Sequence, residues 1–139
     1  MEASFDLDRF VNAQNPVFEE VCAELQRGRK EGHWMWFIFP QLEGLGQSWM
    51  AKKFAISSRA EAEAYLAHPI LGARLLTCTG LVNLVEGRSI EQIFGSIDTL
   101  KFRSSMTLFG EVAPGDTVFK KALQKYFAGQ GDRLTLHRL

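Results

Sequence analysis

Apolar residues recur at three- and four-residue spacing along most of the chain, which is the periodicity of amphipathic helices. The first such stripe extends from Val17 to Leu25 and is followed by Gly28, a residue type that commonly ends helices. Asn15 and Pro16 precede the stripe, and these residue types suit the N-cap and the first helical position. The pattern therefore predicts a helix that begins at these two residues and ends at the glycine.

Capping residues mark further helices along the chain. Two pairs have the spacing of a capping box, in which the N-cap and the third helical residue satisfy each other's backbone N–H groups: Ser58 with Glu61, and Ser89 with Gln92. The first of these helices should stop before Pro69, because a residue that precedes proline avoids helical geometry. The second should be short and end near Gly95.

Three more apolar stripes complete the predicted set of helices. One covers residues 71–85, with Gly87 placed as its C-terminal cap. Asp98 is expected to cap a second helix, and Asp116 a third that ends before Gly129. Several of these helices are too short to be stable in isolation, so tertiary packing must hold them.

Strand signals are scarce by comparison. No alternating run of five or more residues flanks an Asn-Gly or Asp-Gly turn. The sequence therefore predicts an all-α fold, a compact multihelical single domain of about seven or eight helices that includes residues 1–139. Five of the eleven phenylalanines fall on the helical stripes, which assigns them to the core: Phe18, Phe102, Phe109, Phe119 and Phe127.

Composition and charge exclude some classes of function. Of the 139 residues, 46% are hydrophobic, and 16 Lys and Arg balance 16 Asp and Glu, so the general attraction that nucleic-acid and membrane-surface binders use is missing. The longest apolar run, 34–39, is far below the roughly 18 residues that cross a bilayer. The charges are nevertheless uneven, because residues 1–25 carry six acids and one base, whereas 101–139 carry seven bases and three acids. A local anion site therefore remains open.

The cysteines and the N-terminus predict the compartment. Cys22 and Cys78 stand among apolar neighbours without a metal-binding spacing, which indicates buried free thiols. The acidic start, residues 1–6, lacks the basic and apolar regions of a secretory signal. We therefore expect a cytoplasmic protein.

The most distinctive segment is 28–41, which combines positive charge, an imidazole and two indoles. A helix over 33–39 would be apolar on both faces, with His33, Trp36 and Phe37 on one side. One interpretation is a core helix with satisfied indole N–H groups, and the other is a pocket for an aromatic, anionic ligand. The candidate ligand-binding residues are Arg29, Lys30, Trp34, Trp36 and Gln41, and His33 is a candidate catalytic acid or base.

A second candidate segment is 98–107. Asp98, Lys101 and Ser105 share one helical face, and an acid, a base and a hydroxyl there suit acid/base or anion-binding chemistry. The alternative is a capping aspartate with a local surface ion pair. Hydroxyl residues inside a helix oppose its propensity, which keeps the functional interpretation open. The candidates are Lys101 and Ser105 as catalytic residues, and Arg103 and Ser104 as ligand-binding residues.

No metal site and no cofactor are predicted. The three histidines have neither His-x-x-x-His nor Glu-x-x-His spacing, and the two cysteines form no Cys-x-x-Cys pair.

A set of motifs in order links the chain to a known family. The motifs include Gly28-Arg29-Lys30, the run from His33 to Gln41, Gly44-Leu45-Gly46, His68-Pro69, Ile93-Phe94-Gly95, Lys101, and the run from Ser104 to Phe109. With these the chain closely resembles, over essentially its whole length, a family catalogued as domain of unknown function 1810 (DUF1810). The resemblance implies a multihelical single domain, found mainly in bacteria and sometimes labelled calpastatin, with no established activity. The chain departs from the family at Glu31-Gly32, where a base and a serine more often precede His-Trp.

The family motifs coincide with the two candidate segments, so we hypothesise a shared pocket for a small anionic metabolite. It would combine His33, Trp36 and Gln41 with Lys101, Ser104 and Ser105. One version is an enzyme acting on a nucleotide-like or ADP-ribose-like anion, with Lys101 or Arg29 on the phosphate, and another binds such a ligand without turnover. A third version is a protein-interaction module with an exposed patch at Trp49 and Met50.

Overall fold

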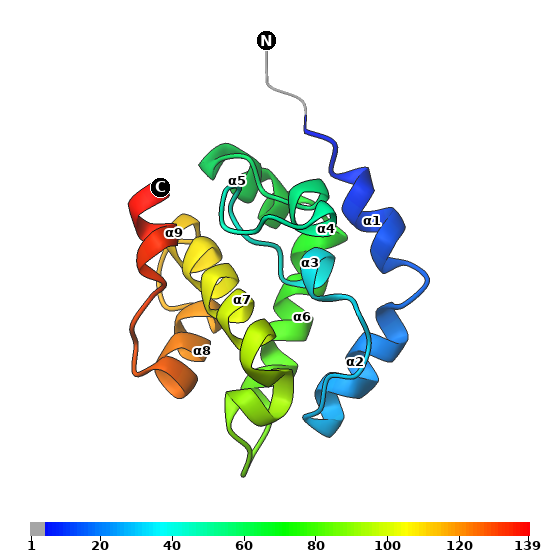
Figure 1. Cartoon of the computed structure of the whole chain (residues 1–139), viewed down its shortest axis with the longest axis vertical. Coiled ribbons are helices and arrows are strands. Elements are labelled where there is room, and N and C mark those ends of the chain that lie inside the picture. Colours follow the sequence, from blue (N-terminus) through cyan, green and yellow to red (C-terminus); the bar gives the residue numbers. More distant parts are fainter. Residues whose placement is uncertain (1–4) are drawn as a thin grey trace.

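The computed structural model describes residues 5–139, which form nine α-helices and no strand (Figure 1). The helices are α1 (Asp8–Gln14), α2 (Phe18–Arg27), α3 (Met35–Ile38), α4 (Trp49–Lys53), α5 (Arg59–Ala67), α6 (Leu71–Leu84), α7 (Ile90–Val112), α8 (Val118–Phe127) and α9 (Arg133–Arg138). The predicted all-α fold is confirmed. Nine helices exceed the expected number because α1 and α9 also form at the two ends of the described residues.

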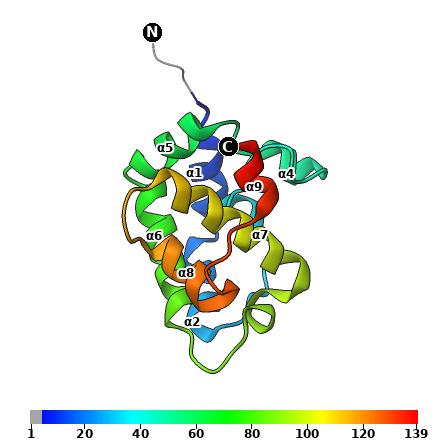
Figure 2. The ribbon, with the colours of Figure 1, turned by 90° about the vertical axis from the view of Figure 1, so that its left-hand side faces the viewer.

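Helices α6 and α7 occupy the centre of the molecule. α6 packs against α2, α5 and α8, and α7 packs against α5, α8 and α9. In Figure 1, α1 and α2 lie on one side of this central pair, and α8 and α9 lie on the other. Figure 2 shows α4 and α5 at the end of the molecule nearest the N-terminus. The single turn of α3 contacts α1, which brings the segment around residues 28–41 to the middle of the fold.

Three helix ends follow the predicted capping residues. Gly28 ends α2 in the left-handed region, with φ 71°. Ser89 begins α7 with both bonds of a capping box: its hydroxyl accepts from the Gln92 N–H at 3.1 Å, and the Gln92 side chain accepts from the Ser89 N–H at 2.8 Å. α5 ends at Ala67, before Pro69.

Two predicted helix starts are wrong. Asn15 and Pro16 form the connection between α1 and α2, and α2 starts only at Phe18. Thr117 takes the N-cap position of α8 that was expected of Asp116, because the threonine hydroxyl accepts from the backbone N–H three residues later.

The capping box expected at Ser58 is only half formed. The Ser58 hydroxyl accepts from the Glu61 N–H at 3.2 Å. The Glu61 carboxylate, however, accepts from the Ser57 N–H at 2.7 Å and pairs with Arg9 at 3.1 Å, so it is used to join α1 to α5. Gly87 has φ 73° but lies beyond the end of α6 rather than at its cap.

A kink divides α7 where a helix end was predicted. Gly95 has φ 82° and ψ 167°, and the helix resumes with Ser96. Asp98 therefore lies in the first turn of the resumed helix and not at its N-cap, which corrects the expectation for this residue. Thr99 spans the kink, because its hydroxyl lies within hydrogen-bond distance of two carbonyl oxygens, that of Gly95 at 2.6 Å and that of Ile90, before the kink, at 3.3 Å.

The core between α3, α7 and α8 is aromatic. The fully buried ring of Phe102 lies 5.0 Å from that of Phe39, 4.9 Å from that of Phe94 and 6.4 Å from that of Phe127. These rings come from segments far apart in the sequence. The cluster therefore fixes the loop before α4 against both halves of α7.

The two cysteines are free, but only Cys78 is buried as expected. Burial raises the pKa of the Cys78 thiol, which favours its protonated form. Cys22, on α2, is partly accessible, so the prediction of two buried thiols is correct for one of them.

Among residues 5–139, no helix combines the length and apolar character needed to cross a bilayer. The interpretation of the acidic N-terminus depends mainly on residues 1–4, which lie outside the described residues.

Candidate functional site

A buried carboxylate shapes the loop that follows α2. Glu24 accepts hydrogen bonds from the backbone N–H groups of Glu31 at 2.7 Å and Gly32 at 2.9 Å, and from the indole of Trp34 at 3.0 Å. Burial raises the pKa of the Glu24 carboxyl, but these hydrogen bonds lower it further, and the net pKa lies below its ordinary value. The ionised Glu24 therefore holds the loop that carries Lys30 in one conformation.

The predicted helix over 33–39 is reduced to the single turn of α3, with Trp34 as its N-cap. His33 is exposed, Trp36 is half-buried and Phe37 is buried, so these three side chains do not share one face as expected. Trp34 is buried and its indole N–H donates to Glu24, as expected for a tryptophan of the core. Only His33 and Trp36 remain available to a pocket.

The two candidate segments meet around the carboxylate of Asp98. Lys30 Nζ lies 2.8 Å from one Asp98 oxygen, and Lys101 Nζ lies 3.6 Å from the other. The Lys101 ammonium also lies over the Trp36 ring, 4.8 Å from its centroid. The backbone ties the segments as well, because the Lys30 N–H donates to the carbonyl oxygen of Ile93 at 2.8 Å.

A hollow of about 360 Å³ opens beside this junction, and we call it the Trp36 hollow. It is lined by Lys30, His33, Met35, Trp36 and residues 94–98 at the kink of α7. The resumed helix begins at Ser96, and its first residues line the hollow. This N-terminus is the positive end of the helix dipole. Lys30, the indole of Trp36 and a helix N-terminus therefore line one open space. Lys101 does not line it, but its ammonium lies next to two lining residues, Asp98 and Trp36.

Of the seven predicted ligand-binding residues, five do not line the Trp36 hollow: Arg29, Trp34, Gln41, Arg103 and Ser104. Arg29 extends into solvent, and its guanidinium lies 3.9 Å from the carboxylate of Glu31. Gln41 lines a different hollow, next to the loop before α4. Arg103 turns to the opposite side of α7, where it donates to the carbonyl oxygen of Gln130 at 3.0 Å. Arg103 and Lys101 point to different sides of α7 because successive positions on a helix do so, whereas Arg29 and Gln41 lie in loops outside the helices.

The structure places both predicted serines of α7, Ser104 and Ser105, in the interior. Ser105 is fully buried, so its hydroxyl cannot reach a ligand from solvent, and within the described chain it has no hydrogen-bond partner. Ser104 is also buried, and its hydroxyl donates to the Leu100 carbonyl oxygen at 3.1 Å. This bond within the helix accounts for the Ser104 hydroxyl without a ligand.

Sequence reasoning missed the residues that the kink contributes. Phe94, Gly95, Ser96 and Ile97 line the Trp36 hollow but carry no titratable group that would single them out. The predicted helix end at Gly95 was a signal for this part of the site, because a break in a helix leaves backbone N–H groups free to bind a ligand.

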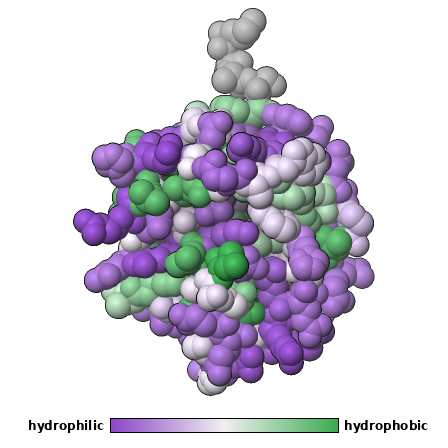
Figure 3. Space-filling view, in the orientation of Figure 1, coloured by the Kyte–Doolittle hydropathy of each residue, from purple (hydrophilic) through white to green (hydrophobic). Residues whose placement is uncertain are grey.

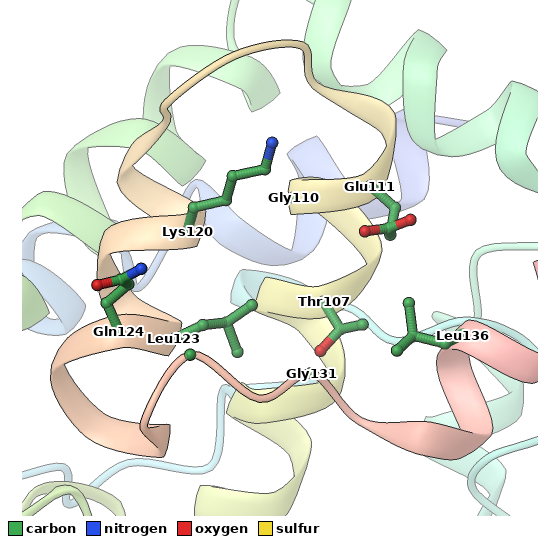
Figure 4. A pocket seen from close by; sticks show the side chains of 9 residues that line it. Thr107, Gly110, Glu111, Lys120, Leu123, Gln124, Gly131 and Leu136 are labelled. Carbon is green, nitrogen blue, oxygen red and sulfur yellow. The ribbon is translucent and has the colours of Figure 1, made fainter.

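A second hollow, of about 320 Å³, lies between α7, α8 and α9 (Figure 4). It shares no lining residue with the Trp36 hollow. Its side chains of opposite charge, Glu111 and Lys120, lie on either side of Gly110 in Figure 4. Neither the sequence motifs nor the family resemblance indicated this hollow.

The surface gives limited support to an interaction patch at Trp49. Trp49 is 70% exposed, but Met50 packs against the core, so the expected pair does not form one apolar surface. The face shown in Figure 3 is largely hydrophilic, with separate apolar patches. Ile97 and Leu100 on α7, and Leu134 on α9, are the most exposed aliphatic residues of these two helices.

Within residues 5–139, no group of three or more His, Cys, Asp or Glu side chains is placed to hold a metal ion.

Comparisons with known proteins define the family but not a function. The model of the family described as "Protein of unknown function (DUF1810)" matches residues 4–139. No curated protein matches the chain. A crystal structure of the conserved hypothetical protein Rv1873 from Mycobacterium tuberculosis is similar, with 57% sequence identity, a TM-score of 0.96, and coverage of 97% of this chain and 96% of that chain.

Proposed function

Because the chain belongs to the DUF1810 family, whose description states no function, we propose a function from the site itself: the Trp36 hollow binds a small anionic ligand with a planar group, such as a nucleoside phosphate. One observation carries this proposal. Lys30 and Lys101, far apart in the sequence, both lie at the carboxylate of Asp98 beside the half-buried ring of Trp36.

The charges of the junction favour an anion. Two ammonium groups share one carboxylate, so the group of three has a net positive charge. Their side chains are only 9%, 19% and 22% exposed for Lys30, Asp98 and Lys101, and charges shielded from water interact more strongly. The helix N-terminus at Ser96 adds backbone N–H groups, which bind phosphates in many proteins.

Asp98 occupies the position of an anion in the free protein. Its carboxylate holds both ammonium groups, so a phosphate that binds there must compete with it for Lys30 and Lys101. The charges of Lys30 and Lys101 therefore favour binding of an anion, whereas the charge of Asp98 opposes it. Removing the Asp98 charge should strengthen binding of an anion, whereas removing a lysine charge should weaken it.

We assign the contact with the planar part of the ligand to the ring of Trp36. Its ring lines the hollow beside the exposed side chain of Ile97, and stacking of a base on an aromatic ring contributes about 1–3 kcal/mol. A sugar phosphate lacks such a ring and should therefore bind less tightly than a nucleoside phosphate.

The proposed function is ligand binding. Any chemical step on the bound ligand is assigned to His33. His33 lines the Trp36 hollow, and an imidazole is the side chain that most often acts as a general acid or base. Ser105 has no part in the proposal because of its burial.

The experiment measures thermal stabilisation by adenosine diphosphate, adenosine monophosphate, ribose 5-phosphate and inorganic phosphate. A ligand at 100 times its Kd should stabilise the protein by about 2.7 kcal/mol. Replacing Lys101 with glutamine should weaken nucleotide binding about tenfold, since a hydrogen bond to a charged group contributes about 1.5–3 kcal/mol. Asp98→Asn should instead strengthen it.

Lys121→Gln, which removes the same charge from an exposed position on α8, is the matched control and should leave binding unchanged. The proposal fails if none of the four anions stabilises the protein, or if Lys101→Gln and Lys121→Gln behave alike. The alternative of an interaction module at Trp49 predicts no stabilisation by these anions.

A further inference from the structure

The two cysteines lie opposite each other where α2 packs against α6. Cys22 on α2 and Cys78 on α6 are 56 positions apart in the sequence, and the two helices lie next to each other in Figure 1. The thiol groups of Cys22 and Cys78 are hydrogen-bonded to each other. Neither belongs to the Trp36 hollow, so the pair is separate from the proposed anion site.

Contacts on both sides of the cysteines support this pairing. One turn earlier on each helix, the guanidinium of Arg74 lies over the ring of Phe18, 4.8 Å from its centroid. At the end of α2, a Cβ atom at Gly28 would lie 3.0 Å from a methyl group of Val85. The partners at all three places are 56 or 57 positions apart, so α2 and the chain of α6 run parallel in a constant register. This register holds the two thiols face to face.

The two thiols differ in accessibility and in acidity. Cys22 is partly accessible, whereas Cys78 is buried. Burial raises the pKa of the Cys22 thiol, although the hydrogen bond from Cys78 and the charge of Arg74 partly offset this. Burial also raises the pKa of the Cys78 thiol, and the neighbouring Cys22 raises it further. Cys22 is therefore the thiol that ionises first and that a small oxidant can reach.

We propose that hydrogen peroxide oxidises Cys22 and Cys78 to an intramolecular disulfide that joins α2 to α6. The Cys22 thiolate attacks one oxygen of the peroxide and the O–O bond breaks. Cys22 becomes a sulfenic acid, and the departing hydroxide takes up the proton that Cys22 lost. The Cys78 sulfur then attacks the Cys22 sulfur, and the S–S bond forms. The sulfenic oxygen leaves with the Cys78 proton as water, so the two thiols give two electrons to the peroxide.

The disulfide should stabilise the fold. It connects two residues that are far apart in the sequence, and such a link restricts the unfolded chain. The register between α2 and α6 already brings the two sulfur atoms together, so the helices need not move far. We therefore expect the oxidised protein to melt about 5–15 °C above the reduced protein.

The test treats the protein with millimolar hydrogen peroxide, then denatures it and adds N-ethylmaleimide. We expect a monomer whose intact mass has fallen by two hydrogen atoms and that carries no maleimide. Reduction with dithiothreitol should restore two reactive thiols and the original melting temperature. Because the chain has only two cysteines, this mass identifies the bond without any substitution.

Single-cysteine variants assign the two roles. In Cys78→Ser, the sulfenic acid of Cys22 has no thiol to react with, so the trapping reagent dimedone should label it. In Cys22→Ser, the remaining thiol is buried, and no dimedone adduct should form in the folded protein. Circular dichroism checks that both variants fold. Three results would overturn the proposal: two maleimide groups on the peroxide-treated protein, a disulfide-linked dimer in place of the internal bond, or equal dimedone labelling of both folded variants.

Discussion

Replacing Phe102 with alanine is expected to lower the free energy of unfolding by about 3–5 kcal/mol. The Phe102 ring is fully buried and contacts the rings of Phe39, Phe94 and Phe127. Alanine loses these contacts and leaves a cavity that the surrounding helices cannot close completely. Urea unfolding followed by circular dichroism measures the change.

Phe102→Leu should cost less than the alanine variant, because leucine fills much of the cavity. Leu100→Ala is the control on the same helix, since Leu100 is 65% exposed, and its change should stay within about 0.5 kcal/mol. Equal effects of the Phe102 and Leu100 variants would contradict the assignment of Phe102 to the core.

Glu24→Gln is expected to lower the free energy of unfolding by about 2–3 kcal/mol at neutral pH. The ionised carboxylate accepts from Glu31, Gly32 and Trp34, and an amide directs its own donors toward some of these groups. The lowered pKa of Glu24 gives the sign of the pH dependence. Its stabilisation is complete above the ordinary glutamate pKa and disappears as the pH falls through the lower folded value.

The measurement is the unfolding free energy of both proteins from neutral pH to below about pH 4. The difference between them should shrink toward acid pH, because protonation of Glu24 removes the same charge as the substitution. Glu19→Gln, exposed on α2, should show no such convergence. A constant difference at all pH values would contradict an ionised Glu24 as the source of the stabilisation.

Much of the fold could be predicted from short-range patterns. The apolar stripes identified the helices because a buried face repeats with the helical period. Ser89 and Gln92 identified the start of α7 because the capping box is complete within four residues. Ser58 and Glu61 have the same spacing, but Arg9 from α1 takes the carboxylate, and no local pattern contains a partner so distant in the sequence.

The site was predicted only in part for the same reason. The hypothesis combined His33, Trp36 and Gln41 with Lys101, Ser104 and Ser105. The structure brings Lys101 into contact with Trp36, whereas Gln41 lies at another hollow. Spacing along a helix could not show that Ser105 faces the core, because its neighbours in space come from other segments. The second hollow depends on three helices at once, so no single stretch of the sequence indicates it.

The central claim is that the Trp36 hollow binds a nucleoside phosphate. The most direct measurement is the chemical shift of the three tryptophan indole N–H signals as adenosine diphosphate is added. The Trp36 signal should move together with the backbone amides of Ser96 and Ile97, while that of the exposed Trp49 stays in place. An unchanged Trp36 signal at saturating nucleotide, or movement of Trp49 alone, would contradict it.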